Sequence, residues 1–200
     1  MLRPALIVVG LLAIGGMPAA AQDESIQPLP DVGIEELGQG EDSQLDALFA
    51  TLRSTADAAA AKSAENDIIR LWLESGSDTT DLLMEWTLSA MEKKNYPLAL
   101  DYLDRIISLQ PDYVEGWNKR ATVHFLIDDY GKAIADIERT LALEPRHFGA
   151  LSGLGTIMRD IGDNDRAVVA YRQALEIDPY LETVREALDE IAAEDSGRKI

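Results

Sequence analysis

One pattern is repeated three times between residues 80 and 181 of this chain of 200 residues. Pro111, Pro145 and Pro179 each follow the previous proline by 34 residues. Two further sets of positions keep the same interval: Ala99, Ala133 and Ala167, and Leu109, Leu143 and Ile177. A fixed period of this size, in sequence whose apolar residues have helical spacing, predicts a stacked row of helix hairpins.

Each period predicts a first helix, a turn and a second helix. The candidates for capping the first helix of the first repeat are Thr79, Thr80 and Asp81. Its expected core residues are Leu83, Trp86 and Ala90. Pro97 falls in the first turn of the second helix, where its missing N–H costs nothing. The small residues at 99, 133 and 167 are expected to let the two helices of each hairpin approach closely.

The N-terminus has the composition of an export signal. Arg3 provides a short positive region, residues 5–14 are apolar except for Gly10, and residues 19–21 are alanines. We expect residues 1–21 to be a signal peptide that is cleaved after Ala21. The alternative is an uncleaved membrane anchor, but a membrane span needs about 20 apolar residues and this run is much shorter. No direct membrane insertion is expected after cleavage. The mature protein is therefore expected to be periplasmic or secreted.

Two segments precede the clear repeats. Residues 22–43 carry seven acidic residues and no Lys or Arg, and they predict a disordered acidic linker. Residues 44–77 have two apolar stripes at helical spacing and predict a degenerate hairpin, in which Ser77 stands where the period would place a proline. We expect this hairpin to be an atypical terminal repeat that caps one end of the array.

The C-terminal segment predicts a further helix. Residues 182–195 place one apolar face opposite several acidic residues, which is typical of a capping helix that covers the last hairpin. That face consists of Val184, Ala187, Leu188, Ile191 and Ala192. Residues 196–200 are expected to be a frayed tail.

The repeated residues resemble the motif of the tetratricopeptide repeat (TPR) family, in which Trp, Leu-Gly, Tyr, Ala, an aromatic residue, Ala and Pro keep a fixed phase. The matching residues are Trp117, Leu154, Gly155, Tyr96, Tyr130, Ala99, Ala133, Ala167, Tyr171, Ala174, Pro111, Pro145 and Pro179. The first repeat departs from the motif at Thr87 and Ala90, and the second at Arg120 and Ala121. The resemblance implies an all-α, right-handed α–α superhelical solenoid with TPR repeats at 80–113, 114–147 and 148–181.

The resemblance also implies where a partner would bind, because the first helix of each hairpin lines the concave face in this family. The residues predicted to contact a partner are Met84, Leu88, Met91, Asn118, Thr122, Phe125, Leu126, Ser152, Thr156 and Arg159. The five apolar residues of this set predict a groove for an apolar or amphipathic peptide. In the alternative interpretation, the first hairpin or the linker already covers them.

Some members of the family grip C-terminal carboxylates through Lys, Asn and Arg at inner positions. In this chain Met84 and Leu88 occupy the first two of these positions, and Gly149 and Gly153 occupy late ones. The sequence therefore lacks this clamp, and binding of chaperone tails is not predicted.

The remaining composition argues against chemistry and against two classes of partner. The net charge of −18 disfavours nucleic acid and anionic lipid, and the absence of cysteine excludes thiolate nucleophiles and Cys-ligated metals. His124 is expected to be a packed core residue, and His147 is expected to be solvated in a loop. Arg120 is expected to pair with an acid such as Asp136. No cofactor, metal or enzymatic activity is predicted.

Two functions remain open from the sequence. The first is a non-catalytic scaffold that binds an unidentified protein or peptide, in the assembly or maturation of the cell envelope. The second is a self-associating structural protein that forms a homo-oligomer by stacking its repeat ends. A third hypothesis, that the protein is an enzyme, is disfavoured because the sequence lacks convergent reactive groups.

Overall fold

The computed structural model describes residues 34–198, and in this part of the chain it contains nine helices and no strand. The helices are α1 (Ile34–Ser54), α2 (Ala58–Leu73), α3 (Asp78–Glu92), α4 (Tyr96–Leu109), α5 (Val114–Leu126), α6 (Tyr130–Leu143), α7 (Phe148–Asp160), α8 (Asn164–Ile177) and α9 (Glu182–Arg198). The predicted signal peptide and linker residues 22–33 lie outside the described range. Among the described residues, no helix has both the length and the apolar character needed to cross a bilayer.

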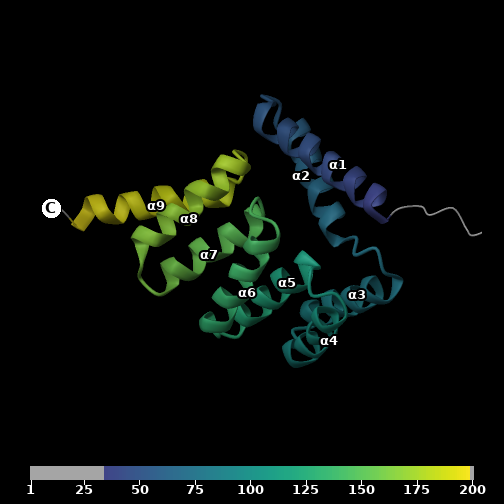
Figure 1. The fold of residues 1–200 in the computed structure, drawn as a ribbon. Helices are drawn as coiled ribbons and strands as arrows, with labels where there is room; N and C mark the ends of the chain where they lie inside the picture. Colours follow the sequence, from purple (N-terminus) through teal and green to yellow (C-terminus); the bar gives the residue numbers. More distant parts are fainter. Residues whose placement is uncertain (1–33, 199–200) are drawn as a thin grey trace, which may run out of the picture. The chain divides into compact units, whose positions relative to one another are not determined.

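The helices pair as antiparallel hairpins that follow the 34-residue period (Figure 1). α3 packs on α4, α5 on α6 and α7 on α8, and α4 and α6 also contact α5 and α7, the first helices of the hairpins that follow them. α9 packs on α8 as the predicted capping helix. The predicted all-α superhelical solenoid is therefore confirmed for α3 to α9.

The turn inside each repeat has the same backbone conformation at the same phase of the period. Lys94, Asp128 and Gly162 follow one another by 34 residues and have positive φ angles of 55°, 61° and 82°. This left-handed conformation ends the first helix of each hairpin and turns the chain toward the second. Asp129 and Asp163 then cap α6 and α8 by accepting hydrogen bonds from backbone N–H groups.

The centre of each hairpin is held by a small residue facing a large one. Ala99, Ala133 and Ala167 are fully buried between the paired helices, as predicted. In the third repeat, a Cβ placed on Gly155 would lie 2.5 Å from the ring of Tyr171, so only glycine fits there. The close approach of α7 and α8 therefore depends on this glycine.

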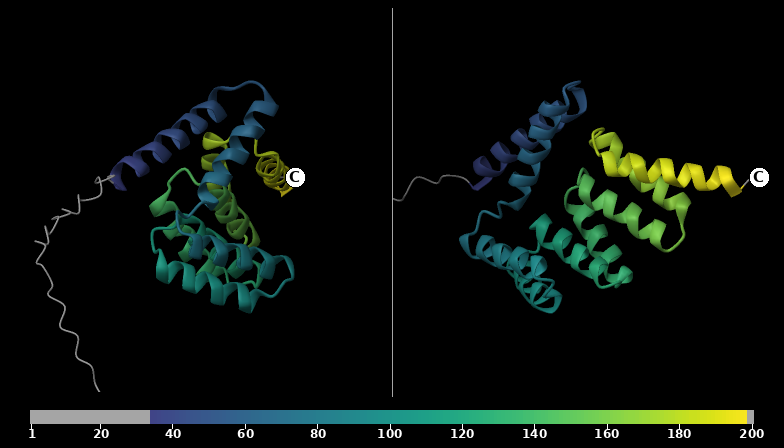
Figure 2. Two further views of the ribbon diagram at one scale, coloured as in Figure 1. Left: turned by 90° about the vertical axis from the view of Figure 1, so that its right-hand side faces the viewer. Right: turned by 180° about the vertical axis from the view of Figure 1, so that it is seen from behind.

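The first hairpin does not lie where the period predicts. α2 contacts α5, and α1 contacts α8, so this hairpin runs along the loops that join successive repeats (Figures 1 and 2). The Tyr113 hydroxyl donates to the Leu73 carbonyl at 2.9 Å, and the Tyr180 hydroxyl donates to the Thr55 carbonyl at 2.8 Å. The prediction that the hairpin caps the end of the array is wrong, because its apolar face packs on the loops instead.

Four local predictions also need correction. α1 begins at Ile34, so residues 34–43 are helical rather than part of a disordered linker, and α9 continues to Arg198. Gly38 and Gly40 lie within residues 34–43. Each costs a helix only about 1 kcal/mol in propensity, so the helix still forms. α3 is capped by the Ser77 hydroxyl rather than by residues 79–81. Trp86 was expected in the core and is 46% exposed.

Candidate functional site

A pocket of about 140 Å³ lies between α5 and α7, with Ile137 of α6 in its lining. Its lining residues are Asn118, Ala121, Thr122, Phe125, Ile137, Gly149, Ala150, Gly153, Thr156 and Ile157. Four of these, Asn118, Thr122, Phe125 and Thr156, belong to the set predicted from the helix phase. The walls are mostly apolar, with one amide and two hydroxyl groups at the edge.

Two glycines four residues apart on α7 widen this pocket. A Cβ on Gly153 would have Ile137 Cδ1 at 3.8 Å as its nearest neighbour, which is ordinary contact distance. A larger residue would therefore fit at Gly153, although glycine costs a helix interior about 1 kcal/mol relative to alanine. In the sequence, Gly149 and Gly153 only indicated that the carboxylate clamp is absent, and their spacing of four residues on one helix was the signal that both line one face.

A buried polar network joins the N-terminal ends of α5 and α7, the two helices that form the walls of the pocket. His147 Nδ1 accepts a hydrogen bond from the Ala150 N–H at 3.0 Å, and its Nε2 lies 3.1 Å from Glu115 Oε1. Because Nδ1 is an acceptor, the proton is on Nε2, which donates to Glu115. The other oxygen of Glu115 accepts from the Asn118 amide at 2.9 Å. The network therefore fixes the start of α5 to the start of α7.

The position of His147 contradicts the prediction from the sequence. His147 is 2% exposed and was expected to be solvated. Its ring stacks on Trp72, with centroids 4.1 Å apart and an angle of 9° between the planes. The first hairpin, which was expected elsewhere, covers the loop after Pro145 and buries this side chain.

The charge on Glu115 is stabilised in spite of its burial. Burial by itself raises the pKa of the carboxyl group, but the hydrogen bond from His147, the charge of Lys119 and the hydrogen bond from Asn118 together lower the pKa to about 2. Glu115 therefore remains an acceptor for both neighbours over the whole range in which the protein is expected to work.

Other residues of the predicted binding set lie apart from the pocket. Met84 is 3% exposed and packs with Leu73, Tyr113 and Val123, as the alternative interpretation predicted. Leu88 and Leu126 are exposed, Met91 is partly buried against the cluster around Met84, and the hydroxyl of Ser152 donates to its own helix. The structure thus places one end of the predicted groove in the core.

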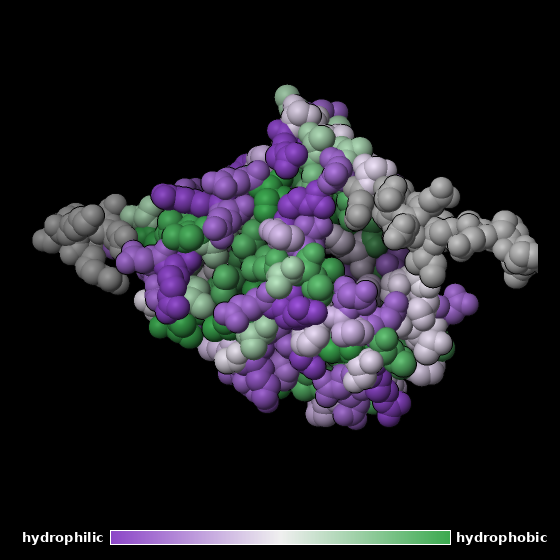
Figure 3. Space-filling view, in the orientation of Figure 1, coloured by the Kyte–Doolittle hydropathy of each residue, from purple (hydrophilic) through white to green (hydrophobic). Residues whose placement is uncertain are grey.

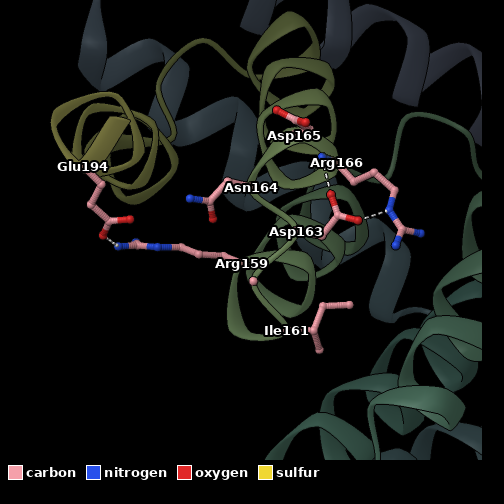
Figure 4. A pocket seen from close by; sticks show the side chains of 8 residues that line it. Arg159, Ile161, Asp163, Asn164, Asp165, Arg166 and Glu194 are labelled. Atoms are coloured by element: carbon pink, nitrogen blue, oxygen red, sulfur yellow. Dashed lines mark hydrogen bonds and ion pairs between the residues drawn. The ribbon is translucent and has the colours of Figure 1, made fainter. Parts of the chain in front are cut away.

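Arg159 extends toward Glu194 of α9 (Figure 4) and does not line the pocket between α5 and α7. Its guanidinium lies 2.7 Å from Glu190 and 3.5 Å from Glu194, so it pairs with the capping helix. These contacts border an open hollow between the α7–α8 turn and α9, which Asp163 and Arg166 also line. Arg159 therefore links α7 to the last helix, and its side chain is only 29% exposed.

Two predictions about polar residues near the site are confirmed. Arg120 donates to both carboxylate oxygens of Asp136, at 2.8 and 2.7 Å, and also to Asp104. His124 is buried against the same cluster, and burial lowers the pKa of its imidazole. Within residues 34–198, no group of three or more His, Asp or Glu side chains is arranged to hold a metal ion.

The fold and the pocket define a class of protein, the helical repeat solenoids with a concave face. The family model described as tetratricopeptide repeat matches residues 118–182. A TPR repeat-containing protein of Rhizobium etli is 38% identical over 189 residues, which are 94% of this chain and 91% of the relative. This chain belongs to the tetratricopeptide repeat family.

Solved structures of low sequence identity share the fold. The first TPR of Spaghetti (RPAP3), bound to an HSP90 peptide, has a TM-score of 0.56 and 20% identity over 58% of this chain and 93% of that one. The Sgt2 TPR domain from Aspergillus fumigatus has a TM-score of 0.57 and 22% identity over 62% of this chain and 83% of that one.

Proposed function

We propose that this chain is a non-catalytic protein-interaction scaffold that holds a peptide or protein partner in the pocket between α5 and α7. The observation that carries the proposal is Gly153, which leaves room in a helix interior where a larger residue would fit and would stabilise the helix. The buried network through Glu115 and His147 supports it, since this network keeps the two pocket walls at a fixed separation.

The chemistry of the pocket favours an apolar or amphipathic segment. Apolar side chains from α5, α6 and α7 form most of the lining, and the groups at its edge are neutral. The solved Spaghetti domain is bound to an HSP90 peptide. In this chain the positions of the carboxylate clamp hold Met84, Leu88, Gly149 and Gly153, so a peptide would be held by its side chains rather than by a terminal carboxylate.

We also propose that the protein acts outside the cytoplasm, in the assembly or maturation of the envelope. The support is the sequence of residues 1–21, with Arg3, an apolar run and small residues before Gln22. Peptide mapping of the protein recovered from its host tests this directly. A mature N-terminus at Gln22 is expected, and recovery of the intact residues 1–21 would contradict export with cleavage.

A pocket-filling variant tests the binding proposal. The full chain, Gly153→Leu and the matched surface variant Val169→Leu would each be used to capture proteins from the host envelope fraction. Val169 is exposed on α8, so its change should leave the captured set unaltered. Gly153→Leu should keep the helical content and lose the partner, whereas an identical captured set for all three proteins would contradict the pocket as the binding site.

A further inference from the structure

The first hairpin leaves one side of α3 and α4 uncovered, the side that in the later repeats is turned toward the preceding repeat. We call this side the outer face. In the second and third repeats, the corresponding faces are buried by the second helix of the preceding repeat, α4 or α6. Leu82 has the same phase as Gly116 and Ala150, which are both buried in this way. Because α2 packs toward α5 instead, only its last residue, Leu73, packs against the cluster around Leu83 and Met84, and α4 is the helix that packs along α3.

Leu82, Trp86 and Tyr102 on this open face are each larger than their equivalents in the other two repeats. Trp86 corresponds by phase to Arg120 and Leu154, and Tyr102 corresponds to Asp136 and Ala170. The exposed apolar residues of the face are Leu82, Trp86, Leu98 and Leu109. Figure 3 shows hydrophobic residues reaching the surface in the region of α3 and α4. A face exposed only to solvent would not be expected to carry several large apolar side chains together.

Two hollows run along the groove between α3 and α4, on either side of Trp86. One has a volume of about 460 Å³ and lies between Trp86, Leu98 and Tyr102. The other has a volume of about 580 Å³ and lies between Trp86, Leu82 and Leu109. The ring centroids of Trp86 and Tyr102 are 5.7 Å apart, and Trp86 lines both hollows. A long apolar groove between two helices has the shape that accepts a third helix.

The charges that line the groove indicate the chemistry of the partner. Lys93 lines one hollow and Arg105 the other, and neither forms an ion pair with a residue in the described range. Asp104 also lines the groove, but its carboxylate accepts a hydrogen bond from Arg120 at 2.8 Å. The exposed Glu85 and Asp101 line neither hollow. In a chain of net charge −18, this groove is therefore lined by available cations.

We propose that the outer face of α3 and α4 is a second docking surface, separate from the concave pocket, for an amphipathic helix with acidic residues beside its apolar stripe. The helix takes the place that α4 holds against α5 in the next repeat, with its apolar stripe over Trp86 and its acidic groups near Lys93 and Arg105. A second copy of the chain fits less well, because its own groove carries the same cations and the exposed side of α9 is acidic without large apolar residues.

Two synthetic peptides test this proposal on the full chain. Both carry the same helical stripe of leucines, and the flanking positions hold glutamate in one peptide and lysine in the other. The glutamate peptide should bind at least ten times more tightly and shift the tryptophan emission to shorter wavelength. The shift should disappear in Trp86→Phe, which assigns the signal to Trp86.

Surface variants then locate the binding. Trp86→Asp should weaken binding of the glutamate peptide more than tenfold and keep the circular dichroism of the wild type, since this side chain is half exposed. The matched variant Val169→Asp, on exposed α8 surface, should bind as the wild type does. The double variant Lys93→Glu/Arg105→Glu should prefer the lysine peptide.

Three results would overturn the proposal. The first is equal binding of the two peptides, or no binding of either. The second is unchanged binding to Trp86→Asp. The third is that the wild type sediments as a dimer and Trp86→Asp sediments as a monomer. The occupant of the face would then be a second copy of this chain.

Discussion

The indole of Trp72 lies flat against the imidazole of His147, with ring centroids 4.1 Å apart. These residues come from the first hairpin and from the loop between the second and third repeats. Phe148 also packs on this indole, with ring centroids 5.1 Å apart, and the Arg146 guanidinium lies over the ring of Phe49 of α1. This aromatic cluster fixes the first hairpin to the repeat loops and so determines which faces of the array remain open.

Replacing Trp72 with alanine should release the first hairpin. Trp72 is buried against α1 and the start of α7, and loss of a large buried aromatic side chain costs about 3–5 kcal/mol. Urea unfolding should show a decrease of this size in the free energy of unfolding, with earlier proteolytic cleavage between α2 and α3.

Trp86→Ala is the matched control for this change, because Trp86 is 46% exposed. It should cost less than about 1 kcal/mol. Equal stability losses in the two variants would show that the first hairpin does not depend on the stack with His147.

Glu115 should make stability depend on pH in the acid range. Its pKa is about 2 in the folded protein, below the ordinary value of 4.5. As the pH falls, Glu115 is therefore protonated in the unfolded state at a higher pH than in the folded state. Its contribution to the free energy of unfolding is complete above pH 4.5 and is lost as the pH falls toward 2. The shift corresponds to roughly 3 kcal/mol.

The measurement compares the wild type with Glu115→Gln by urea unfolding between pH 2 and pH 6. The wild type should be more stable at pH 6, and the difference should shrink as the pH falls below 4.5. A difference that stays constant over this range would contradict the assignment of the shift to this carboxylate.

Two glycines on one helix should respond in opposite directions to the same substitution. Gly155→Ala places a methyl group 2.5 Å from the Tyr171 ring, and such overpacking should cost about 1–3 kcal/mol. Gly153→Ala meets no close neighbour and should stabilise α7 by up to about 1 kcal/mol. Thermal unfolding of both variants provides the comparison, and equal signs would contradict the packing around Tyr171.

The ion pair of Arg120 and Asp136 should be replaceable as a pair. Arg120→Leu alone leaves a buried carboxylate without its guanidinium and should cost about 3–5 kcal/mol. The next repeat has Leu154 and Ala170 at the corresponding positions. The double variant Arg120→Leu/Asp136→Ala copies this apolar pair and should recover most of the loss. A double variant as unstable as the single one would show that the second repeat cannot adopt the packing of the third.

The 34-residue period predicted the hairpins because the features that define them are local. The positive φ at Lys94, Asp128 and Gly162 and the small residues between paired helices each depend on neighbours within one repeat. The phase of the repeats likewise predicted that Asn118, Thr122, Phe125 and Thr156 lie on the inner face, and all four line the pocket between α5 and α7.

The placement of the first hairpin could not be predicted in the same way. The apolar stripe containing Trp72 predicts that this side chain is buried, but not which surface buries it. His147 follows a proline and is polar, so solvation was the simpler expectation from the sequence. Its burial depends on a contact with Trp72, which is 75 residues away in the chain. The same contact left Trp86 exposed, because the helix expected to cover it packs elsewhere.

Hydrogen exchange of the full chain, with and without the partner captured from the host, tests the central claim that the pocket between α5 and α7 holds a partner. Bound partner should slow exchange in α5 and α7 around Thr122 and Gly153, and Gly153→Leu should abolish this protection. Unchanged exchange in α5 and α7, with protection confined to other helices, would contradict the claim.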